Sequence, residues 1–184
     1  MRVLVLVFLV GCYDPGVEDC QFRCGGGMLC PDGSECRGGF CRTTDATQCA
    51  NDPCANTPDP PPNCGNKFPL LDADGCGVVC TASATHDEVQ GECSPGWRAG
   101  ILDSRTELDT VPITTGRFWV GAQRVNAMFQ WFSGAPVDPS AWDSGFPNFS
   151  GSSCVYLEGT RHRLRNDRSC FDDQLYICTY PATN

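Results

Sequence analysis

Short runs of aromatic and branched apolar residues recur through the second half of the chain. They occur at Phe118-Trp119-Val120, Val155-Tyr156-Leu157 and Leu175-Tyr176-Ile177, and residues of these types favour extended backbone. The segment from Ala122 to Ser153 is instead rich in Gly, Pro, Ser and Asp, with aromatic residues interspersed. A loop of that length without regular structure is unusual unless it is functional. This half of the chain therefore predicts several strands and one long loop.

Two helix starts precede or adjoin these runs. Thr85-His86-Asp87-Glu88 and Ser104-Arg105-Thr106-Glu107 each place a Glu three positions after a hydroxyl residue. In such a capping box the hydroxyl accepts a free backbone N–H, and the carboxylate reaches back to the first residue. Pro112 ends the second helix within two turns, because proline cannot continue it. The predicted fold class is α+β, with two short helices, small antiparallel sheets and a long loop.

The region from Cys12 to Cys64 has a different composition. It holds nine of the 15 cysteines but few large apolar side chains, so disulfides must supply its order. Glycine-rich and Pro-Asp-Gly turn signals separate the cysteines, which predicts tight loops and one short hairpin. We expect a disulfide-stapled stalk over residues 12–54, a semi-rigid proline-rich linker over residues 55–63 and a globular domain over residues 64–180.

The first residues have the pattern of an export signal. Met1-Arg2 precedes the apolar run Val3 to Val10, which is too short for a membrane-spanning helix of about 20 residues. The run ends in Leu9-Val10-Gly11-Cys12, which resembles the bacterial lipoprotein signal, where the bond before the Cys is cut and its thiol carries a lipid. Residues 1–11 are therefore the predicted signal peptide and Cys12 the predicted lipidation site. The alternative is an ordinary secretory signal with a chance Cys.

Composition and charge narrow the compartment and the class of partner. Fifteen cysteines indicate an oxidising compartment, and only two histidines are present to complete cytosolic zinc sites. We expect a bacterial cell-envelope protein held to the membrane by its lipid alone, or otherwise a secreted protein. A net charge of −9 excludes a basic protein that binds nucleic acid.

The sequence offers little for catalysis. His86 lies in a predicted helix and His162 in a basic run, and neither has a nucleophile in its sequence context. Asp172 and Asp173 are adjacent on a predicted loop, which is weak support for acid–base chemistry. We therefore expect a protein that is not an enzyme.

Several landmarks follow one another through residues 64–180. They are a first helix that ends in Cys93, a second helix entry at Ala99 to Glu107, Phe118-Trp119-Val120-Gly121-Ala122, Phe129-Gln130-Trp131 with Gly134, Trp142 to Asn148, Cys154 to Leu157, Arg165 to Cys170, and Tyr176-Ile177-Cys178. In this order and at this spacing, the segment resembles the C-type lectin-like domain. The resemblance implies that the small disulfide-rich module precedes a non-enzymatic binding domain.

The same resemblance implies a disulfide map. Cys93 would pair with Cys178, Cys154 with Cys170, and Cys64 with Cys76 in an N-terminal hairpin. Cys80 is then left over, and we expect it to pair with a cysteine of the N-terminal region.

The resemblance also implies where a ligand would bind. In sugar-binding members, one calcium ion and the sugar share ligands from a Glu-Pro-Asn or Gln-Pro-Asp triplet, a following Glu and an Asn-Asp pair. Here Asn148, Asn166 and Asp167 are retained, Phe146 replaces the first residue of the triplet, and Ser152 or Ser153 replaces the Glu. A single carboxylate makes a poor calcium site. Either this degraded site still binds calcium and sugar, or Asn166 and Asp167 order the loop.

Two further groups of residues are candidates for binding. Phe146 and Phe149 flank Pro147 and could stack on a sugar or on a partner surface. Arg161, Arg163 and Arg165 would share one face of an extended segment and, with Arg168, would suit an anionic glycan or lipid headgroup. The alternative is that Asp172, Asp173 and Glu158 neutralise these arginines.

Taken together, the residues predict a surface-anchored binding module that recognises carbohydrate, with or without calcium at the degraded site. The rival hypothesis is protein–protein adhesion, or a structural surface domain without sugar binding, in which Phe146, Phe149 and neighbouring aromatic residues contact a protein partner.

Overall fold

The computed structural model describes residues 30, 32–37, 40–43, 52–70 and 75–180. The predicted signal peptide, Cys12 and most of the predicted stalk lie outside the described residues. Among the residues that are described, no helix has the length and apolar character needed to cross a membrane.

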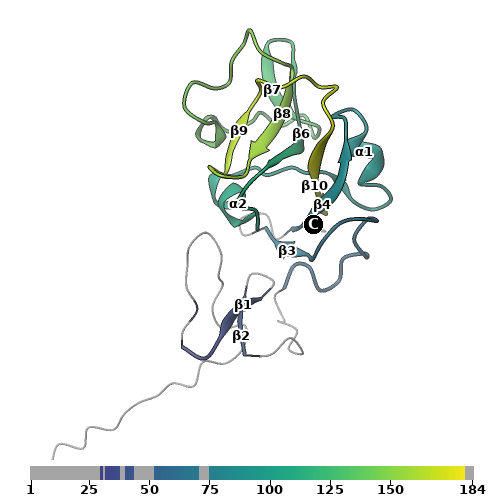
Figure 1. The fold of residues 1–184 in the computed structure, drawn as a ribbon, viewed down its shortest axis with the longest axis vertical. Helices are drawn as coiled ribbons and strands as arrows, with labels where there is room; N and C mark the ends of the chain where they lie inside the picture. The colour runs from purple at the N-terminus through teal and green to yellow at the C-terminus, as the bar shows by residue number, and fades with distance from the viewer. Residues whose placement is uncertain (1–29, 31, 38–39, 44–51, 71–74, 181–184) are drawn as a thin grey trace, which may run out of the picture.

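The described part of the predicted stalk contains a short antiparallel hairpin of β1 (Glu35–Arg37) and β2 (Phe40–Arg42). A disulfide joins Cys30 to Cys41 of β2. Arg42 pairs with Asp52 at 3.0 Å, which links the hairpin to the chain that follows. Figure 1 shows this hairpin below the larger C-terminal lobe.

The C-terminal lobe is built on one eight-stranded sheet. Its path is β3-β4-β10-β6-β8-β9, with β5 beside β10 and β7 beside β6. All pairs are antiparallel except β10 with β6, which is parallel. The elements are β3 (Phe68–Pro69), β4 (Cys76–Ala84), α1 (Val89–Glu92), β5 (Arg98–Ala99), α2 (Arg105–Thr110), β6 (Arg117–Val125), β7 (Met128–Trp131), the 3-10 helix η1 (Pro139–Ala141), β8 (Cys154–Glu158), β9 (Arg163–Arg165) and β10 (Gln174–Tyr180).

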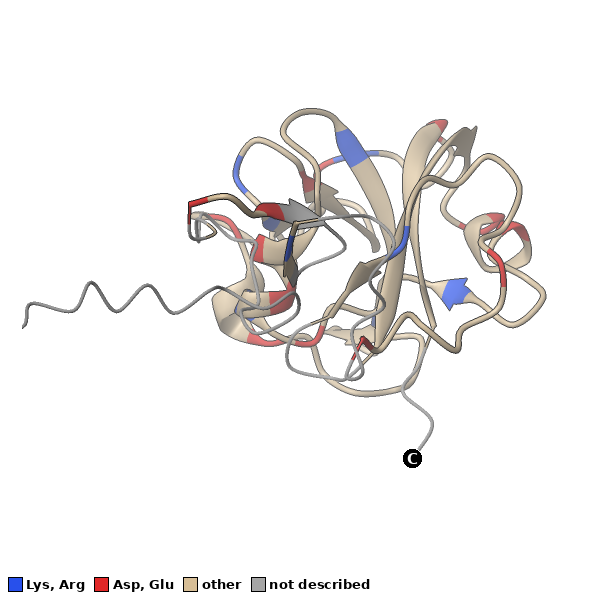
Figure 2. Cartoon of the chain, turned by 90° about the horizontal axis from the view of Figure 1, so that it is seen from below, with Lys and Arg blue, Asp and Glu red and all other residues tan. Residues whose placement is uncertain are grey.

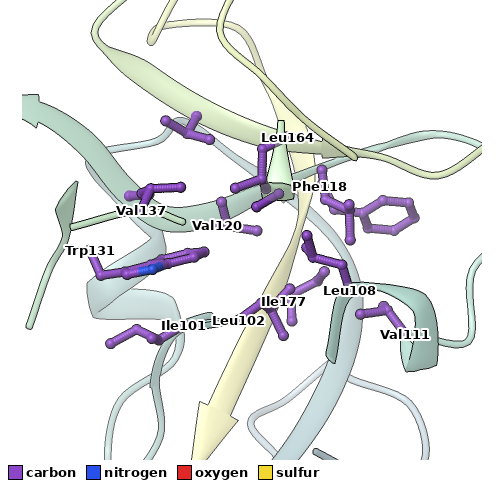
Figure 3. Packing of buried hydrophobic residues seen from close by; sticks show 14 of the residues in the cluster. Ile101, Leu102, Leu108, Val111, Phe118, Val120, Trp131, Val137, Leu164 and Ile177 are labelled. Atoms are coloured by element: carbon purple, nitrogen blue, oxygen red, sulfur yellow. The ribbon is translucent and has the colours of Figure 1, made fainter. Parts of the chain in front are cut away.

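Both faces of the central strands are buried. Successive side chains of a strand point to opposite faces of the sheet, so Phe118 and Val120 of β6 join one apolar cluster while Trp119 joins another. Strand β10 divides in the same way, with Ile177 in the first cluster and Tyr176 in the second. Figure 3 shows the first cluster, in which Phe118, Val120 and Ile177 pack with residues of α2, of β7 and β9 and of the loops, including Leu102, Leu108, Val111, Trp131, Val137 and Leu164.

The two predicted capping boxes form only in part: Glu88 reaches back to Thr85 without a hydroxyl cap on α1, and Ser104 caps α2 while the Glu107 carboxylate accepts the Asp103 N–H at 2.6 Å. The Thr85 N–H and hydroxyl donate to Glu88 at 2.9 and 2.8 Å, although the helical hydrogen bonding of α1 begins only at Val89. Ser104 caps α2 by accepting the Glu107 N–H at 3.1 Å, and α2 ends at Thr110, two residues before Pro112.

The segment predicted as one long loop contains regular structure. Strand β6 continues to Val125, and a two-residue turn leads directly into β7. Asn126 and Ala127 have positive φ values of 50° and 68°, the backbone that matches the twist of a tight hairpin. This hairpin is hard to predict from the residues, because Ala rarely adopts this conformation. The remaining irregular stretch follows η1 and runs up to β8.

Five disulfides join described cysteines, and one predicted pairing is wrong. Cys93–Cys178 and Cys154–Cys170 are present, as the resemblance implied. Cys64 does not pair with Cys76: it pairs with Cys80, which faces it across an isolated antiparallel bridge. Cys76 instead pairs with Cys54, so the expected bond from the N-terminal region reaches Cys76 rather than Cys80.

We expect the tight crossing at Gly121 to make this position intolerant of any side chain. A Cβ there would lie 2.7 Å from the Ala99 carbonyl oxygen, and that backbone cannot move without disturbing β5. Gly121→Ala should lower the free energy of unfolding by about 2 kcal/mol, measured by denaturant unfolding of the purified protein. Gly91→Ala is the control, because its Cβ would enter open space on α1, and it should be neutral or slightly stabilising.

Candidate functional site

Asn166 directly follows β9, and its side chain holds the irregular stretch before β8 in place. Its side chain is fully buried. Its Oδ1 accepts the Asn148 N–H at 2.8 Å, and its Nδ2 donates to the carbonyl oxygens of Asn148 and Ser152 at 2.7 and 2.8 Å. The side chain of Asn148 turns the other way and accepts from Ser150. The two amide residues are therefore brought together, as elements of the loop's own hydrogen bonding.

Asp167 lies next to Asn166 but makes different contacts. Its Oδ1 accepts the Tyr156 hydroxyl at 2.6 Å, and its Oδ2 accepts from Arg165 at 3.1 Å. Burial raises the pKa of Tyr156 to about 12, and the Asp167 carboxylate acts in the same direction. Partial burial opposes ionisation of Asp167, but the Tyr156 hydrogen bond and the Arg165 charge outweigh it and lower the pKa of its carboxyl. Asp167 is thus ionised and paired on both oxygens.

Arg165 supplies a positive charge in the centre of this group. Its guanidinium carbon lies 4.5 Å from the centre of the Phe146 ring, within the range of a cation–π contact. The same guanidinium bonds Asp167 and lies 4.0 Å from a carboxylate oxygen of Asp143. Phe146, which replaces an acidic or amide ligand in the family pattern, therefore has a defined role as the surface on which Arg165 rests.

These side chains do not fit a calcium ion. Calcium takes six to eight oxygen ligands, several of them anionic. The Asn166 amide and both oxygens of Asp167 already have protein partners, and Phe146 offers no oxygen. The guanidinium of Arg165 contacts Phe146 and Asp167, two of the positions that a calcium ion would need.

The predicted arginine face is not formed as expected. Strand β9 starts only at Arg163, and His162 has a positive φ of 52°, so Arg161 lies in a turn outside the strand. The arginines are neutralised, but by other residues than those expected: Arg161 pairs with Asp143 at 2.9 Å and Arg163 with Asp109 at 3.2 Å. Glu158 pairs with Arg117 instead. Figure 2 shows basic and acidic positions interspersed along the ribbon.

Phe149 lies apart from Phe146. Its ring is 60% exposed and lies 5.9 Å from the ring of Phe129 on β7. Arg124 of β6 donates to the Phe149 carbonyl and lies over the Phe129 ring. The two predicted aromatic candidates therefore belong to separate environments, one packed against Arg165 and one open to solvent beside the hairpin.

The acidic partner Asp143 was not identified from the sequence as a functional residue. It is buried, and its Oδ2 accepts from Arg161 while lying near Arg165. Its position in the Trp142 to Asn148 landmark was visible in the sequence, but its partners follow on β9 and the turn before it, and only the folded chain brings them together. Tyr156 was likewise assigned only to a strand.

Comparison with solved structures places the C-terminal lobe in a known fold. It is similar to the carbohydrate-recognition domain of the mouse scavenger receptor C-type lectin, with a TM-score of 0.54 and 20% identity over 67% of this chain and 98% of that one. The lectin domain of murine dendritic cell inhibitory receptor 2, in complex with N-glycan, gives 0.53 and 20% over 67% and 99%. A calcium-independent type II antifreeze protein gives 0.52 and 20% over 67% and 95%.

The fold is therefore C-type lectin-like, as predicted. No protein-family model matches the sequence, and the search of curated proteins finds no match.

We expect Asn166 to be the residue on which the order of the loop depends. Asn166→Ala would leave the Asn148 N–H and two carbonyl oxygens without their buried partner, and should lower the free energy of unfolding by about 3 kcal/mol. Asn148→Ala removes only an exposed contact to Ser150 and should cost about 1 kcal/mol. Denaturant unfolding of both variants measures the difference, and equal losses would contradict this role.

Proposed function

We propose that this protein is an exported, calcium-independent carbohydrate-binding module. The observation that carries the proposal is Arg165, whose guanidinium contacts Asp167, approaches Asp143 and lies over Phe146. This internal cation compensates the carboxylates that calcium would otherwise compensate, so the loop is ordered without an ion. One protein of similar structure is described as calcium-independent, which supports the idea that the fold does not require calcium.

Several observations support carbohydrate as the ligand class. One of the similar structures is a carbohydrate-recognition domain, and another is a lectin domain in complex with N-glycan. Anionic glycans and lipid headgroups are less suited, because Arg161, Arg163 and Arg165 are each paired with a carboxylate and the chain has a net charge of −9. A neutral sugar, bound through hydroxyl groups and ring faces, fits this surface better.

A second candidate function is adhesion to a protein partner. Phe149 and Met128, 60% and 64% exposed, are large apolar side chains open to solvent, and Phe149 packs beside Phe129 of β7. Exposed large apolar residues are a common feature of protein contact surfaces.

The proposed function predicts binding and stability that do not change when calcium is removed. We expect the purified protein to bind at least one neutral oligosaccharide on a glycan array, equally in millimolar calcium and in chelator. Its melting temperature should be the same in both, whereas an ion at about 100 times its dissociation constant would add roughly 2.7 kcal/mol. Binding lost in chelator would contradict the calcium-independent site, and no glycan binding would favour the adhesion function.

We also propose that Cys12 carries the lipid that attaches the protein to the bacterial cell envelope. The support is the apolar run Val3 to Val10, which ends in the sequence Leu9-Val10-Gly11-Cys12. In a bacterial host, the mature protein should gain the mass of a lipid and fractionate with membranes, and Cys12→Ser should abolish both. Tyr13→Ser, at the neighbouring position, should abolish neither. An unmodified Cys12 in a secreted product would support the ordinary secretory signal.

A further inference from the structure

Two open hollows meet on the surface beside the long loop. The first is lined by residues 150–154 and 167–171, and the second by residues of α1 and of the β6–β7 hairpin. Asp87 and Gln123 line both. The hollows therefore form one continuous depression, which we call the Gln123 groove, and their volumes of about 640 and 660 Å³ are in the range of ligand sites.

The polar lining of the Gln123 groove consists mainly of neutral hydrogen-bonding groups. Serine hydroxyls at 150, 152 and 153 line the first hollow, and the amides of Gln90 and Gln130 line the second. Amides and hydroxyls both donate and accept, as sugar hydroxyls do. Charge is limited, since Asp167 is compensated by Arg165, which leaves Asp87 and Arg168 as one acidic and one basic group.

An aromatic ring lies in each hollow. Phe171 lines the first and is 80% exposed, and Phe132 lines the second and is 37% exposed. Each ring lines only one hollow, while Asp87 and Gln123 lie where the hollows meet. Apolar ring faces that flank polar groups offer surfaces on which the hydrophobic face of a sugar ring can rest.

The backbone on both sides of Phe171 is fixed, although its side chain projects into solvent. The Cys170 carbonyl accepts the His86 N–H at 3.1 Å, and the Asp172 carbonyl accepts the Trp119 indole N–H at 3.1 Å. Cys170 is also bonded to Cys154 of β8. The backbone at Phe171 is thus held in place while the ring stays outside the core, so a ligand has only the side chain to order.

The chain segments that carry Asp87 and Gln123, where the hollows meet, are also fixed. The ring of the buried His86 contacts the carbonyl oxygens of Val120 and Ala122 through Nε2, at 3.1 and 3.0 Å, and packs edge-on against Phe132 at 5.5 Å. Burial lowers the pKa of His86, against the opposing effects of those carbonyls and of Asp87. One residue therefore ties together the turn that carries Asp87, the strand that carries Gln123 and the ring of Phe132.

We infer that the Gln123 groove is the carbohydrate site, and that it binds a neutral oligosaccharide with sugar rings against Phe171 and Phe132 and hydroxyls on Asp87 and Gln123. This inference rests on the proposed function and places the ligand beside, rather than on, the group formed by Phe146, Asn166 and Arg165. It also implies a ligand longer than a single sugar, because Phe171 and Phe132 line different hollows.

The test is calorimetric titration, in chelator, of neutral glucose, mannose, galactose and N-acetylglucosamine oligomers from single sugars to hexasaccharides. We expect affinity for the preferred series to rise from the single sugar to the oligomer. Phe171→Ala and Gln123→Ala should each weaken binding by about tenfold, the loss of one stacked ring or one set of hydrogen bonds. Phe171 makes no core contact, so its variant should keep the melting temperature of the native protein.

Phe149→Ala is the matched control, because Phe149 is also an exposed phenylalanine but does not line the Gln123 groove. Its affinity should stay within about twofold of the native value. Oligosaccharide binding that is lost in Phe149→Ala and kept in both groove variants would overturn the groove while leaving the proposed function intact. Binding of single sugars as tight as that of oligomers would overturn the two-ring geometry. Failure of every oligosaccharide to bind would overturn both proposals.

Discussion

The parallel pairing of β10 with β6 determines where everything else in the C-terminal lobe lies. Parallel neighbours need a crossover connection between them, and here that connection is the whole stretch from the end of β6 to the start of β10, which includes β7, β8 and β9. The loop ordered by Asn166, the arginine-rich turn and Phe171 all belong to this excursion. Strand β4 on the other side of β10 and the Cys93–Cys178 disulfide hold the last strand in place. The connection is therefore a long excursion whose two ends are held side by side in the sheet.

Within that connection, a side chain of the protein itself compensates the carboxylate charges of Asp143 and Asp167. A domain that collects carboxylates on a loop must either bind a cation or provide one, since like charges at close range oppose folding. Arg165 provides it, and Phe146 gives the guanidinium a flat surface to lie on. The result is a loop whose order is part of the folding free energy rather than a function of the ion concentration outside. The proposed contacts with sugar can therefore lie elsewhere on the surface, in the Gln123 groove.

Much of the fold follows from local chemistry that a sequence displays. The helix cap at Ser104 and the apolar runs of β6, β8 and β10 depend on near neighbours, and they formed as predicted. The pairing of Cys64 with Cys80 did not, because it is decided by which strands face each other across the sheet. The candidate site is similar in this respect. Asn166, Asp167 and Phe146 were identified from the sequence. The contacts of Asp167 and Phe146 depend on Arg165, which also approaches Asp143 only in the folded chain. The exposure of Phe171 has no sequence signal, since a buried phenylalanine looks the same in one dimension.

The Cys54–Cys76 disulfide has a mechanical consequence. A covalent bond joins the end of the region predicted as a stalk to the first residue of β4, so tension on the N-terminal side of the chain passes from Cys54 directly into the sheet. The load therefore reaches β4 without passing through the chain between the two cysteines. Because β4 pairs with β10, the pull is shared with the central strands of the sheet. Asp87 follows the end of β4 and Gln123 lies on β6, so a load between the N-terminal region and a ligand in the Gln123 groove would run through the disulfide and the sheet.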